Sequence, residues 1–401
     1  MSTIQLSDRA RNTPPSPIRK LAHLAVKAKK SGVQVYHLNI GQPDIASPKE
    51  FFDGLSLFKQ KVVAYEQSQG NEGLCVAWSK YINKTLGIHT APEQFLITTG
   101  ASEALVFLFI ACCDPGDEIM VFDPTYANYQ GFASIAGVRL VPVLSKMENN
   151  FALPAQSEIE KRITPRTKAI LACSPNNPTG TVCTREDLRF LHDLCEANNL
   201  FLIVDETYRE FVYDDLEPLS ILNLVPNSER VIVVDSLSKR FSLCGARIGC
   251  LLTCNPEILA ATLKIAQARL AVSTLDQFAS AHMLEYIQDD YLEGVRNEFR
   301  IRRDALYDAL KALPGVSIHK PQGAFYCMVR LPVDSAESFA AFLLSQFSYK
   351  MRTTFIAPAA GFYMQGGQGM QEARFAYVLN KSAIEDAIEA LAAGLKQYQS
   401  R

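Results

Sequence analysis

The strongest constraint on the fold is a regular alternation of short apolar runs and amphipathic stretches between residues 94 and 253. The runs are rich in branched and aromatic residues and too short for helices, which is typical of strands buried on both faces. Strands that alternate with helices form a mostly parallel sheet covered by helices on both sides. The expected strands are residues 94–98, 119–122, 140–143, 169–172, 200–204, 231–234 and 250–253. The pattern predicts an α/β fold.

The pattern changes beyond residue 291. A charged helix is expected over residues 298–313, where Pro314 stops it, and an apolar strand over 323–331. Two further helical patterns cover residues 338–347 and 383–395. This order predicts a smaller α+β domain, which the N-terminal segment 17–39 is expected to join. We therefore expect a large domain of residues 46–290 and a small domain of residues 1–45 and 291–401.

Charge and hydropathy exclude several classes of partner. The net charge of −2 and the pI near 6.3 leave no basic surplus for binding nucleic acid or anionic lipid. The longest apolar run, residues 104–113, is far shorter than the roughly 20 residues of a spanning helix. Residues 1–20 are polar and lack the apolar stretch of a secretory signal. We expect a cytoplasmic protein without nucleic-acid or membrane partners.

The cysteines and histidines give no pattern for a disulfide framework or a metal site. Most of the ten cysteines lie in apolar segments, no CxxC pair occurs, and a chain of this length needs no covalent staples. The six histidines are isolated from one another, without the spacing of metal ligands. We expect most cysteines to be small buried side chains and no metal to be bound.

A lysine between hydroxyl groups is the first candidate for chemistry. Ser236-Leu237-Ser238-Lys239 follows an expected strand, and Arg247 comes eight residues after the lysine. An amine in this setting can bond covalently to an aldehyde cofactor whose phosphate the hydroxyls and the guanidinium hold. A lysine after a strand is, however, more often a solvated charge. The functional interpretation depends on agreement with other segments.

The segment after the strand at 94–98 is a candidate anion site. Gly100 ends the strand, and Ala101 and Ser102 open a helix whose free N–H groups can bind a phosphate. The Ser102 hydroxyl would add a donor. The same residues also fit an ordinary strand-turn-helix connection in which Ser102 caps the helix. This segment alone does not distinguish the two interpretations.

Aromatic and amide side chains follow two further strands. Tyr126 comes directly after the strand at 119–122 and could stack on a flat heteroaromatic ring, although most tyrosines are packed core. Asn177 lies in a turn with two prolines and a final glycine, which could aim its amide at a ring hydroxyl. The same turn is also ordinary loop chemistry.

Asp205 ends the most apolar strand, and Tyr208 lies three residues later. A buried carboxylate needs a cationic partner such as a protonated pyridine nitrogen, unless it caps the following turn. Together the candidates match every functional edge of pyridoxal phosphate. Lys239 bonds the aldehyde, Asp205 holds the ring nitrogen, Tyr126 stacks on the ring, Asn177 and Tyr208 contact the phenolic oxygen, and Ala101, Ser102, Ser236, Ser238 and Arg247 hold the phosphate.

Residues 17–395 resemble the class I/II aminotransferases of the fold-type I pyridoxal-phosphate superfamily. The motifs occur in the family's order: Asn39-Ile40-Gly41-Gln42-Pro43-Asp44, Tyr65 with Gly70 and Leu74, Gly100-Ala101-Ser102-Glu103-Ala104, Pro124-Thr125-Tyr126, Asn176-Asn177-Pro178-Thr179-Gly180, Asp205-Glu206-Thr207-Tyr208, Ser236-Leu237-Ser238-Lys239, Gly323-Ala324-Phe325-Tyr326 and Arg374. The resemblance implies pyridoxal 5'-phosphate as cofactor, bound in the large, mostly parallel domain.

The resemblance also implies roles that the residues alone do not suggest. Arg374 would bind the substrate α-carboxylate as a planar fork, with Asn177 and the backbone of Gly41 beside it. Lys239 would carry the cofactor and then move protons, with Asp205 and Tyr208 as further catalytic residues. Tyr65 would reach the phosphate of a neighbouring subunit, which implies a homodimer. Without the resemblance, Arg374 is interpreted as a surface arginine and Tyr65 as core.

The chain departs from the family pattern at two places. Cys75 stands where the family usually has arginine, and residues 357–362 replace a proline-glycine loop. Both departures affect which substrate subgroup of the family the chain resembles, and not the chemistry that the resemblance implies. Residues 356–363 and 374–379 are most similar to aspartate aminotransferases, which favours aspartate and 2-oxoglutarate as the amino acid and the 2-oxo acid.

The motifs do not determine which amino-acid side chain the substrate carries. Arg269 could bind a second substrate carboxylate or could belong to a structural ion pair. The same cofactor site also serves β-C-S lyases and decarboxylases, which are alternatives. A non-catalytic cofactor-binding regulator is a remote alternative, because no basic DNA-binding module precedes the motifs.

Overall fold

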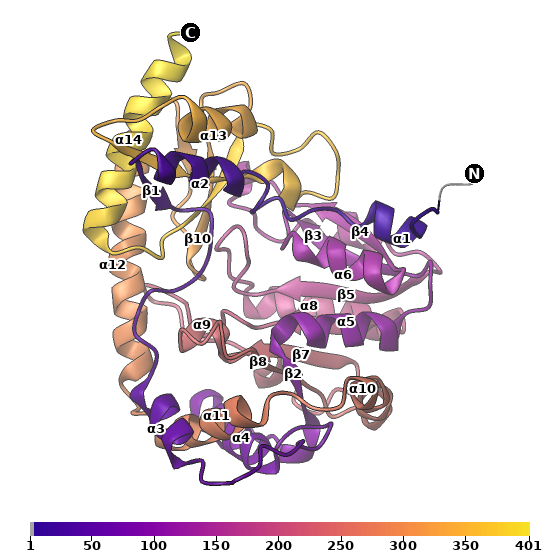
Figure 1. Ribbon diagram of the computed structural model, residues 1–401. Helices are drawn as coiled ribbons and strands as arrows, with labels where there is room; N and C mark the ends of the chain where they lie inside the picture. Colours follow the sequence, from indigo (N-terminus) through magenta and orange to yellow (C-terminus); the bar gives the residue numbers. More distant parts are fainter. Residues whose placement is uncertain (1–3) are drawn as a thin grey trace.

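The computed structural model describes residues 4–401, and its centre is a seven-stranded sheet (Figure 1). The strands are β2 (Phe95–Thr99), β3 (Glu118–Asp123), β4 (Arg139–Leu144), β5 (Thr167–Cys173), β6 (Phe201–Asp205), β7 (Val231–Ser236) and β8 (Ile248–Leu252). Their order is β2-β8-β7-β6-β5-β3-β4. Only β8 runs antiparallel to its neighbours; the other adjacent pairs are parallel. All seven expected strands and the mostly parallel α/β sheet are confirmed.

Helices cover both faces of this sheet, which explains why its strands are apolar throughout. Helices α5 (Gly100–Cys112), α6 (Asn128–Ala136) and α10 (Pro256–Arg269) share one buried cluster with the strands. Helices α4 (Glu72–Leu86), α8 (Arg185–Ala197) and α11 (Thr274–Tyr286) share another. In β6, Ile203 belongs to the first cluster, whereas Leu202 and Val204 belong to the second. Successive side chains therefore point to opposite faces.

The C-terminal part contains α12 (Tyr291–Lys311), α13 (Ala336–Ser345) and α14 (Lys381–Gln399). Its antiparallel sheet has the order β12-β13-β10-β9, with β9 (Ser317–Ile318), β10 (Tyr326–Arg330), β12 (Ala357–Pro358) and β13 (Glu372–Ala376). Helix α12 begins seven residues before the predicted position 298, because the Tyr291 ring stacks on Phe241 and orders the first turn. The predicted strand at 323–331 is shorter in the structure, since Ala324 has a φ of 55°.

The N-terminal segment packs on this C-terminal part. Strand β1 (Gln34–His37) pairs in parallel with β11 (Arg352–Phe355), and α2 (Ala22–Lys30) lies against α13 (Figure 1). One buried cluster joins both segments, with Tyr208, Phe211 and Tyr213 reaching into it from the central part. This shared core supports our proposal that residues 1–45 and 291–401 form the small domain and residues 46–290 the large one.

Short elements complete the chain. They are α1 (Asp8–Asn12), α3 (Lys49–Leu57), α7 (Gln156–Glu160) and α9 (Leu237–Arg240), with the 3-10 turns η1 (Pro92–Gln94), η2 (Met147–Asn149), η3 (Ile221–Asn223) and η4 (Ala359–Phe362). Among residues 4–401, no helix combines the length and apolar composition that crossing a membrane requires. All ten cysteines are free; five are buried and five are half-buried, so burial is less general than the sequence suggested.

Candidate active site

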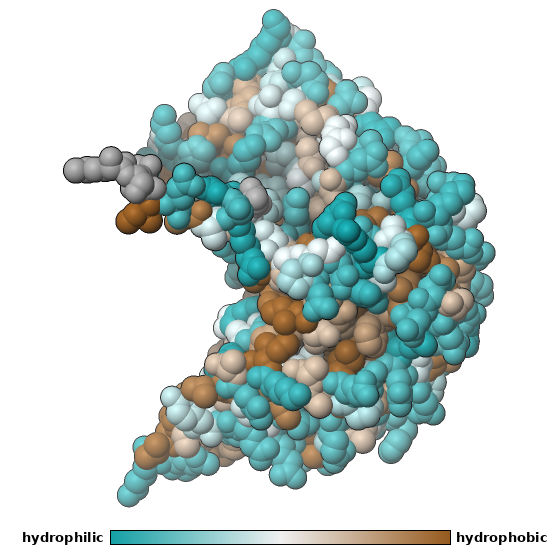
Figure 2. Space-filling model, turned by 90° about the vertical axis from the view of Figure 1, so that its right-hand side faces the viewer, coloured by the Kyte–Doolittle hydropathy of each residue, from teal (hydrophilic) through white to brown (hydrophobic). Residues whose placement is uncertain are grey.

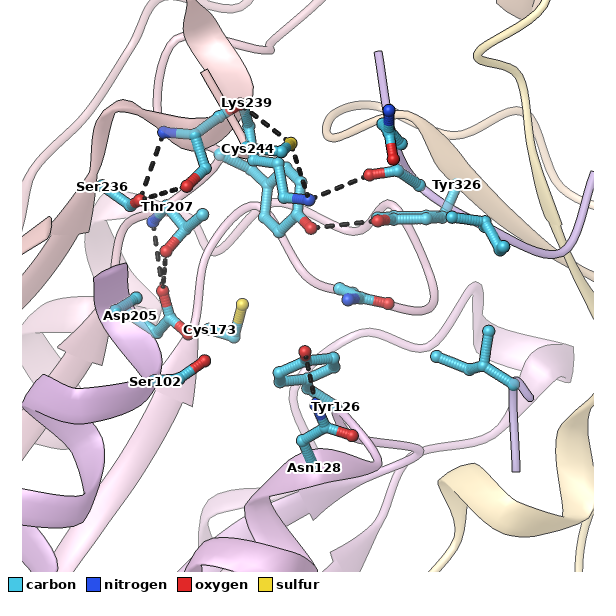
Figure 3. Close-up of a pocket in the computed structure, with 18 of the residues that line it drawn as sticks. Ser102, Tyr126, Asn128, Cys173, Asp205, Thr207, Ser236, Lys239, Cys244 and Tyr326 are labelled. Atoms are coloured by element: carbon cyan, nitrogen blue, oxygen red, sulfur yellow. Dashed lines mark hydrogen bonds between the residues drawn. The ribbon is translucent and has the colours of Figure 1, made fainter. Parts of the chain in front are cut away.

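A cavity of about 610 Å³ lies where the strands of the central sheet end and the following loops begin (Figure 3). Every residue predicted for the site lines this cavity except Tyr65. These residues are Gly41, Ala101, Ser102, Tyr126, Asn177, Asp205, Tyr208, Ser236, Ser238, Lys239, Arg247 and Arg374. Carboxyl ends of parallel strands are the usual ligand position in such sheets, because helices begin there with free N–H groups. The structure thus brings together residues from distant parts of the sequence.

Lys239 lies on the short helix α9, directly after β7, and its amine points into the cavity (Figure 3). Nζ donates a hydrogen bond of 2.9 Å to the carbonyl oxygen of Gly41 and lies 3.7 Å from Sγ of Cys244. The side chain is half-buried rather than solvated. The alternative of an ordinary surface charge is therefore wrong, and the amine is placed to react with a bound carbonyl compound.

The anion-binding end of the cavity is built by close backbone packing. Gly100 has a φ of 71°, and a Cβ there would lie 2.5 Å from Nη2 of Arg247. A Cβ on Gly249 would lie 2.5 Å from the Gly100 carbonyl carbon. The Arg247 guanidinium donates to the Thr99 and Cys244 carbonyl oxygens and has no carboxylate partner within residues 4–401. An N-terminal helix end and an unpaired guanidinium suit a phosphate group.

Serine hydroxyls surround the same end. Ser236 caps α9, and its hydroxyl lies 2.9 Å from that of Ser238. Ser102 lies inside the first turn of α5, whose N-cap residue is Thr99. The capping interpretation of Ser102 is therefore wrong, and its hydroxyl faces the cavity (Figure 3).

Asp205 is buried at the base of the cavity. Its Oδ1 accepts hydrogen bonds from the Thr207 backbone (3.1 Å) and hydroxyl (2.6 Å), so the turn-capping interpretation is also correct. Its Oδ2 accepts a bond of 2.7 Å from the Tyr129 hydroxyl. Desolvation raises the pKa of Asp205, and the bonds from Thr207 and Tyr129 oppose that rise. A cation beside the carboxylate would offset the desolvation, as a protonated pyridine nitrogen does.

Three tyrosines contribute hydroxyl groups to the wall. The Tyr208 and Tyr326 hydroxyls lie 3.0 Å apart. The Tyr126 hydroxyl accepts a hydrogen bond of 2.8 Å from Nδ2 of Asn128. Burial raises the pKa of Tyr126 to about 12, so this phenol stays neutral. Tyr126 is half-buried and borders the cavity, which supports a stacking position more than a core position.

Arg374 is the most informative polar group in the cavity wall. Only 1% of its surface is exposed, and its guanidinium carbon lies 4.3 Å from the Tyr326 ring centre and 4.8 Å from that of Phe362. It donates to Asn177 Oδ1 (2.9 Å) and to the Asn39 carbonyl oxygen (2.6 Å). Nε has no partner, and no carboxylate pairs with Arg374 within the described chain. The surface interpretation is wrong.

Desolvation lowers the pKa of Arg374 because no anion compensates the buried charge. A buried guanidinium with neutral acceptors only is a site that a carboxylate ligand completes. The anion-binding end at Arg247 fits the phosphate of a cofactor, and the unpaired guanidinium of Arg374 fits the carboxylate of an amino-acid substrate. The cavity could therefore hold both molecules side by side.

A buried ion cluster lies behind the site. Arg209 pairs with Glu206 (2.9 Å) and Glu210 (2.8 Å), and Arg240 pairs with Glu210 (2.7 Å) and with Asp235. These residues are sequence neighbours of Asp205, Ser236 and Lys239. Because one missing partner would leave a buried charge, the cluster holds the turn after β6 and helix α9 in one arrangement.

Three predicted residues lie elsewhere. Tyr65 is 83% exposed and outside the cavity, so its interpretation as core is wrong and its role toward a neighbouring subunit stays a prediction. Arg269 lies outside the cavity, where it pairs with Glu103 (3.4 Å) and donates to the Ile97 carbonyl oxygen (3.2 Å). This ion pair favours the structural interpretation, although Nε and Nη1 of Arg269 have no hydrogen-bond partner among residues 4–401. Cys75 is buried in the cluster that contains α4.

Sequence reasoning missed several lining residues. Tyr129, Thr207, Cys173, Cys244 and Arg19 all border the cavity. Thr207 could have been found, because an Asp followed two residues later by Thr is a common turn signal. Tyr129 and Arg19 carry no such signal, since their positions depend on how distant elements pack.

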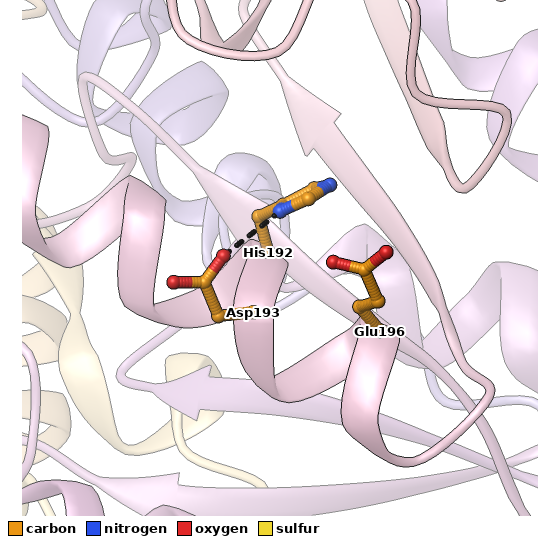
Figure 4. Close-up of side chains that lie close together, drawn as sticks. All are labelled: His192, Asp193 and Glu196. Carbon is orange, nitrogen blue, oxygen red and sulfur yellow. Dashed lines mark hydrogen bonds and ion pairs between the residues drawn. The ribbon is translucent and has the colours of Figure 1, made fainter.

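His192, Asp193 and Glu196 form a small cluster on α8, away from this site (Figure 4). Both imidazole nitrogens already have partners: Nδ1 lies 3.1 Å from Asp193 and Nε2 3.0 Å from the Ser228 hydroxyl. The two carboxylate residues are exposed. These hydrogen bonds account for the arrangement without a metal ion.

Known proteins similar to this chain were found by sequence and by structure. The family model for aminotransferase class I and II matches residues 34–391. The aspartate aminotransferase of Thermotoga maritima is 33% identical over 326 residues, covering 80% of this chain and 84% of that protein. Aromatic-amino-acid aminotransferase 2 of Thermococcus litoralis is 30% identical over 398 residues, 98% of each chain. The structure of Thermus thermophilus aspartate aminotransferase with maleate superposes with a TM-score of 0.88 at 28% identity, covering 98% of this chain and 100% of that one.

Proposed function

The chain belongs to the class I and II aminotransferases, which are pyridoxal-phosphate-dependent enzymes of fold type I, and we propose that its substrates are aspartate and 2-oxoglutarate. The proposal also assigns the cavity around Lys239 as the active site. The observation that carries this assignment is the buried guanidinium of Arg374, which no carboxylate compensates within residues 4–401. Relatives named as aspartate aminotransferases support the substrate pair.

The lining residues divide into groups that fit the parts of the cofactor. Lys239 would bond its aldehyde, and Asp205 would pair with its ring nitrogen. Tyr126 would stack on the ring, while Asn177 and Tyr208 would donate to the phenolic oxygen. Ala101, Ser102, Ser236, Ser238 and Arg247 would hold the phosphate.

Pyridoxal phosphate, when bound, provides a conjugated ring that accepts the electron pair released at the substrate Cα. The carboxylate of Asp205 would stabilise the protonated form of the ring nitrogen, which would strengthen that acceptor. Lys239 would act as a general base toward the proton on the substrate Cα and, as a general acid, would deliver that proton to the cofactor carbon that carried the aldehyde. The nearby Gly41 carbonyl oxygen and Cys244 thiol keep the free Nζ directed toward the cavity.

Arg374 positions the substrate in this scheme. Its planar fork would bind both oxygens of the α-carboxylate, with Asn177 holding the guanidinium in plane. Tyr326 and Phe362 pack on the guanidinium and exclude water from it, which strengthens the interaction with an anion. Gly41 allows the Tyr326 hydroxyl to approach its backbone closely, because a Cβ there would lie 1.7 Å from the hydroxyl oxygen.

We further propose that the enzyme is a cytoplasmic homodimer. Val62, Val63 and Tyr65 expose 70%, 58% and 83% of their surfaces on one loop, which suits burial against a second subunit. Figure 2 shows a deep hollow in one side of the molecule with hydrophobic side chains on its wall. Tyr65 would complete the phosphate site of the partner. Ten unpaired cysteines are compatible with a reducing compartment.

The substrate pair is tested by half-reactions of the cofactor-loaded enzyme. Aspartate, alanine, tyrosine and leucine are added in turn, without any oxo acid, and the absorbance of the bound cofactor is followed. We expect aspartate to convert the cofactor fastest, with one 2-oxo acid formed per site. Faster conversion by alanine, tyrosine or leucine would contradict the proposed substrate pair. Absence of conversion by every amino acid would contradict the assignment of this cavity.

A further inference from the structure

The cavity wall carries an excess of positive charge that the assigned roles do not use up. Its lining includes four cationic side chains, Arg19, Lys239, Arg247 and Arg374, but one carboxylate, Asp205. Under the proposed function, Lys239 bonds the cofactor, Arg247 holds the phosphate and Arg374 binds the α-carboxylate. Arg19 remains without an assigned anion.

The turn that carries Arg19 is fastened to the groups around Arg374. Residues 17–20 form this turn before α2, and the Arg19 backbone N–H donates to Ser16 (3.1 Å). The Asn39 side chain donates a hydrogen bond of 3.2 Å to the Ile18 carbonyl oxygen. The backbone carbonyl oxygen of Asn39 accepts a hydrogen bond of 2.6 Å from the Arg374 guanidinium. One residue therefore bonds both the turn and the guanidinium, so the two cations belong to one wall of the cavity.

The loop that departs from the family pattern supports this turn. A Cβ on Gly361 would lie 2.3 Å from the Cβ of Pro17, so the glycine allows the turn to approach closely. Ile18 packs on a buried cluster that contains Phe362, and the Phe362 ring in turn packs on Arg374. The sequence at 357–362 thus positions the Arg19 turn as well as Arg374.

The charge of Arg19 is not compensated by the protein. Its neighbour Lys20 pairs with Glu337 at 2.5 Å, whereas Arg19 has no ion-pair partner among residues 4–401. The lining residues from the adjoining segments, Ser16, Ile18, Ile40 and Gln42, are neutral. Arg19 is exposed at the cavity edge, so water solvates its guanidinium in this structure, and the group is available to an anionic ligand in the cavity.

We propose that Arg19 binds the second, distal carboxylate of a dicarboxylic substrate while Arg374 binds the first. This inference rests on the proposed function and adds the residue that selects the substrate. It takes the place of Arg269, which does not line the cavity and pairs with Glu103 instead. A guanidinium can accept a carboxylate through two parallel hydrogen bonds, and a substrate without the second carboxylate gains nothing from it.

The test compares Arg19→Gln and Arg19→Lys with the wild-type enzyme, all loaded with cofactor. The matched control is Lys20→Gln, which removes the adjacent cation that is already paired. Half-reaction rates are measured over a range of aspartate, glutamate and alanine concentrations. Loss of a charge-assisted hydrogen bond predicts an increase of about 10- to 100-fold in the half-saturating concentration of aspartate and glutamate for Arg19→Gln.

Three further results are expected. The half-saturating concentration of alanine stays within about two-fold in Arg19→Gln, because alanine lacks the second carboxylate. Arg19→Lys lies between the wild type and Arg19→Gln, since a lysine keeps the charge without the fork. Binding of maleate, a dicarboxylate that cannot react, weakens in Arg19→Gln and not in Lys20→Gln.

Two kinds of result would overturn the proposal in distinguishable ways. If the wild type uses aspartate and Arg19→Gln changes neither its binding nor that of maleate, or weakens aspartate and alanine equally, the role of Arg19 is wrong while the proposed function stands. If the wild type transaminates alanine but neither dicarboxylic amino acid, the proposed substrate pair and the role of Arg19 both fail.

Discussion

The Tyr129 hydroxyl donates a hydrogen bond of 2.7 Å to Oδ2 of Asp205. Tyr129 comes from α6 and Asp205 from the end of β6, and both are buried. The bond lowers the pKa of Asp205, against a larger rise caused by desolvation. Tyr129 therefore helps to keep Asp205 ionised, which is the state that the proposed chemistry requires.

Replacing Tyr129 by Phe removes this bond without removing the ring. We expect the pKa of Asp205 to rise and kcat to fall by about ten-fold, the effect of one lost hydrogen bond to a charged group. The pH dependence of the bound cofactor's absorbance should shift as well. Tyr36→Phe is the control, because it deletes a hydroxyl bond to Asp386 outside the cavity. An unchanged spectrum and kcat in Tyr129→Phe would show that Asp205 needs no such support.

Gly100→Ala tests the proposed phosphate site, which is the anion-binding end of the cavity around Arg247. A Cβ at this position would lie 2.5 Å from the Arg247 guanidinium, and the φ of 71° disfavours any residue with a side chain. We expect the dissociation constant of pyridoxal phosphate to rise by about 10- to 100-fold. Absorbance titration of the apoenzyme measures it. Gly131→Ala, in α6, is the matched control because its Cβ would contact nothing within 4 Å. Equal affinities of the two variants would be incompatible with the proposed phosphate site.

Arg374→Lys keeps the positive charge but loses the planar fork. Because every amino acid has an α-carboxylate, we expect kcat/KM to fall by about 100- to 1000-fold for aspartate and alanine alike. This parallel loss differs from the selective loss expected for Arg19→Gln. Arg330→Lys, on β10 and outside the cavity, serves as the control. A decrease confined to aspartate would mean that Arg374 does not bind the common carboxylate.

Asp123 predicts how stability depends on pH. It is fully buried at the end of β3, its Oδ2 accepts bonds from the Met364 and Gln365 backbones, and its Oδ1 has no partner. Desolvation raises the pKa of Asp123 from 3.8 to about 6. The folded protein thus retains a proton that the unfolded chain has lost in this range, so stability declines as the pH rises from about 4 through 6.

Asp123→Asn removes this titration and keeps the acceptor for the two backbone groups. Between about pH 4 and pH 7, the free energy of unfolding of the wild type should fall by about 2 to 3 kcal/mol relative to the variant. Urea unfolding at both pH values measures the difference. Asp215→Asn, at an exposed position, should show no such change relative to the wild type. A constant difference between wild type and Asp123→Asn would refute the raised pKa.

The elements that could be predicted from the sequence are those with a clear hydrophobic pattern. The seven strands could be located because burial on both faces makes each one apolar over its length, as in β6 and β7. Strands β1 and β11 were not predicted, because their sequences Gln-Val-Tyr-His and Arg-Thr-Thr-Phe are mostly polar and form no continuous apolar run. Helix α12 was predicted too short because its first turn is ordered by the contact of Tyr291 with Phe241 rather than by local propensity.

For the candidate site, prediction succeeded where chemistry follows a strand end. Asp205 ends β6, and Lys239 and Asn177 follow β7 and β5 within a few residues, so their convergence could be inferred from the sheet alone. The burial of Arg374 between Tyr326 and Phe362 could not, because it depends on how β10, β13 and η4 pack. Tyr129 and Arg19 were missed for the same reason. Their positions are tertiary and have no local signature.

The proposed chemistry depends most directly on the reactivity of one amine, that of Lys239. The purified protein is saturated with pyridoxal phosphate and treated with borohydride, and its peptides are then analysed by mass spectrometry. We predict a single stable adduct on Lys239, with no adduct at that position when Lys239→Ala is treated in the same way. Recovery of unmodified Lys239 from fully saturated protein, or a stoichiometric adduct on another lysine, would contradict the assignment of the active site.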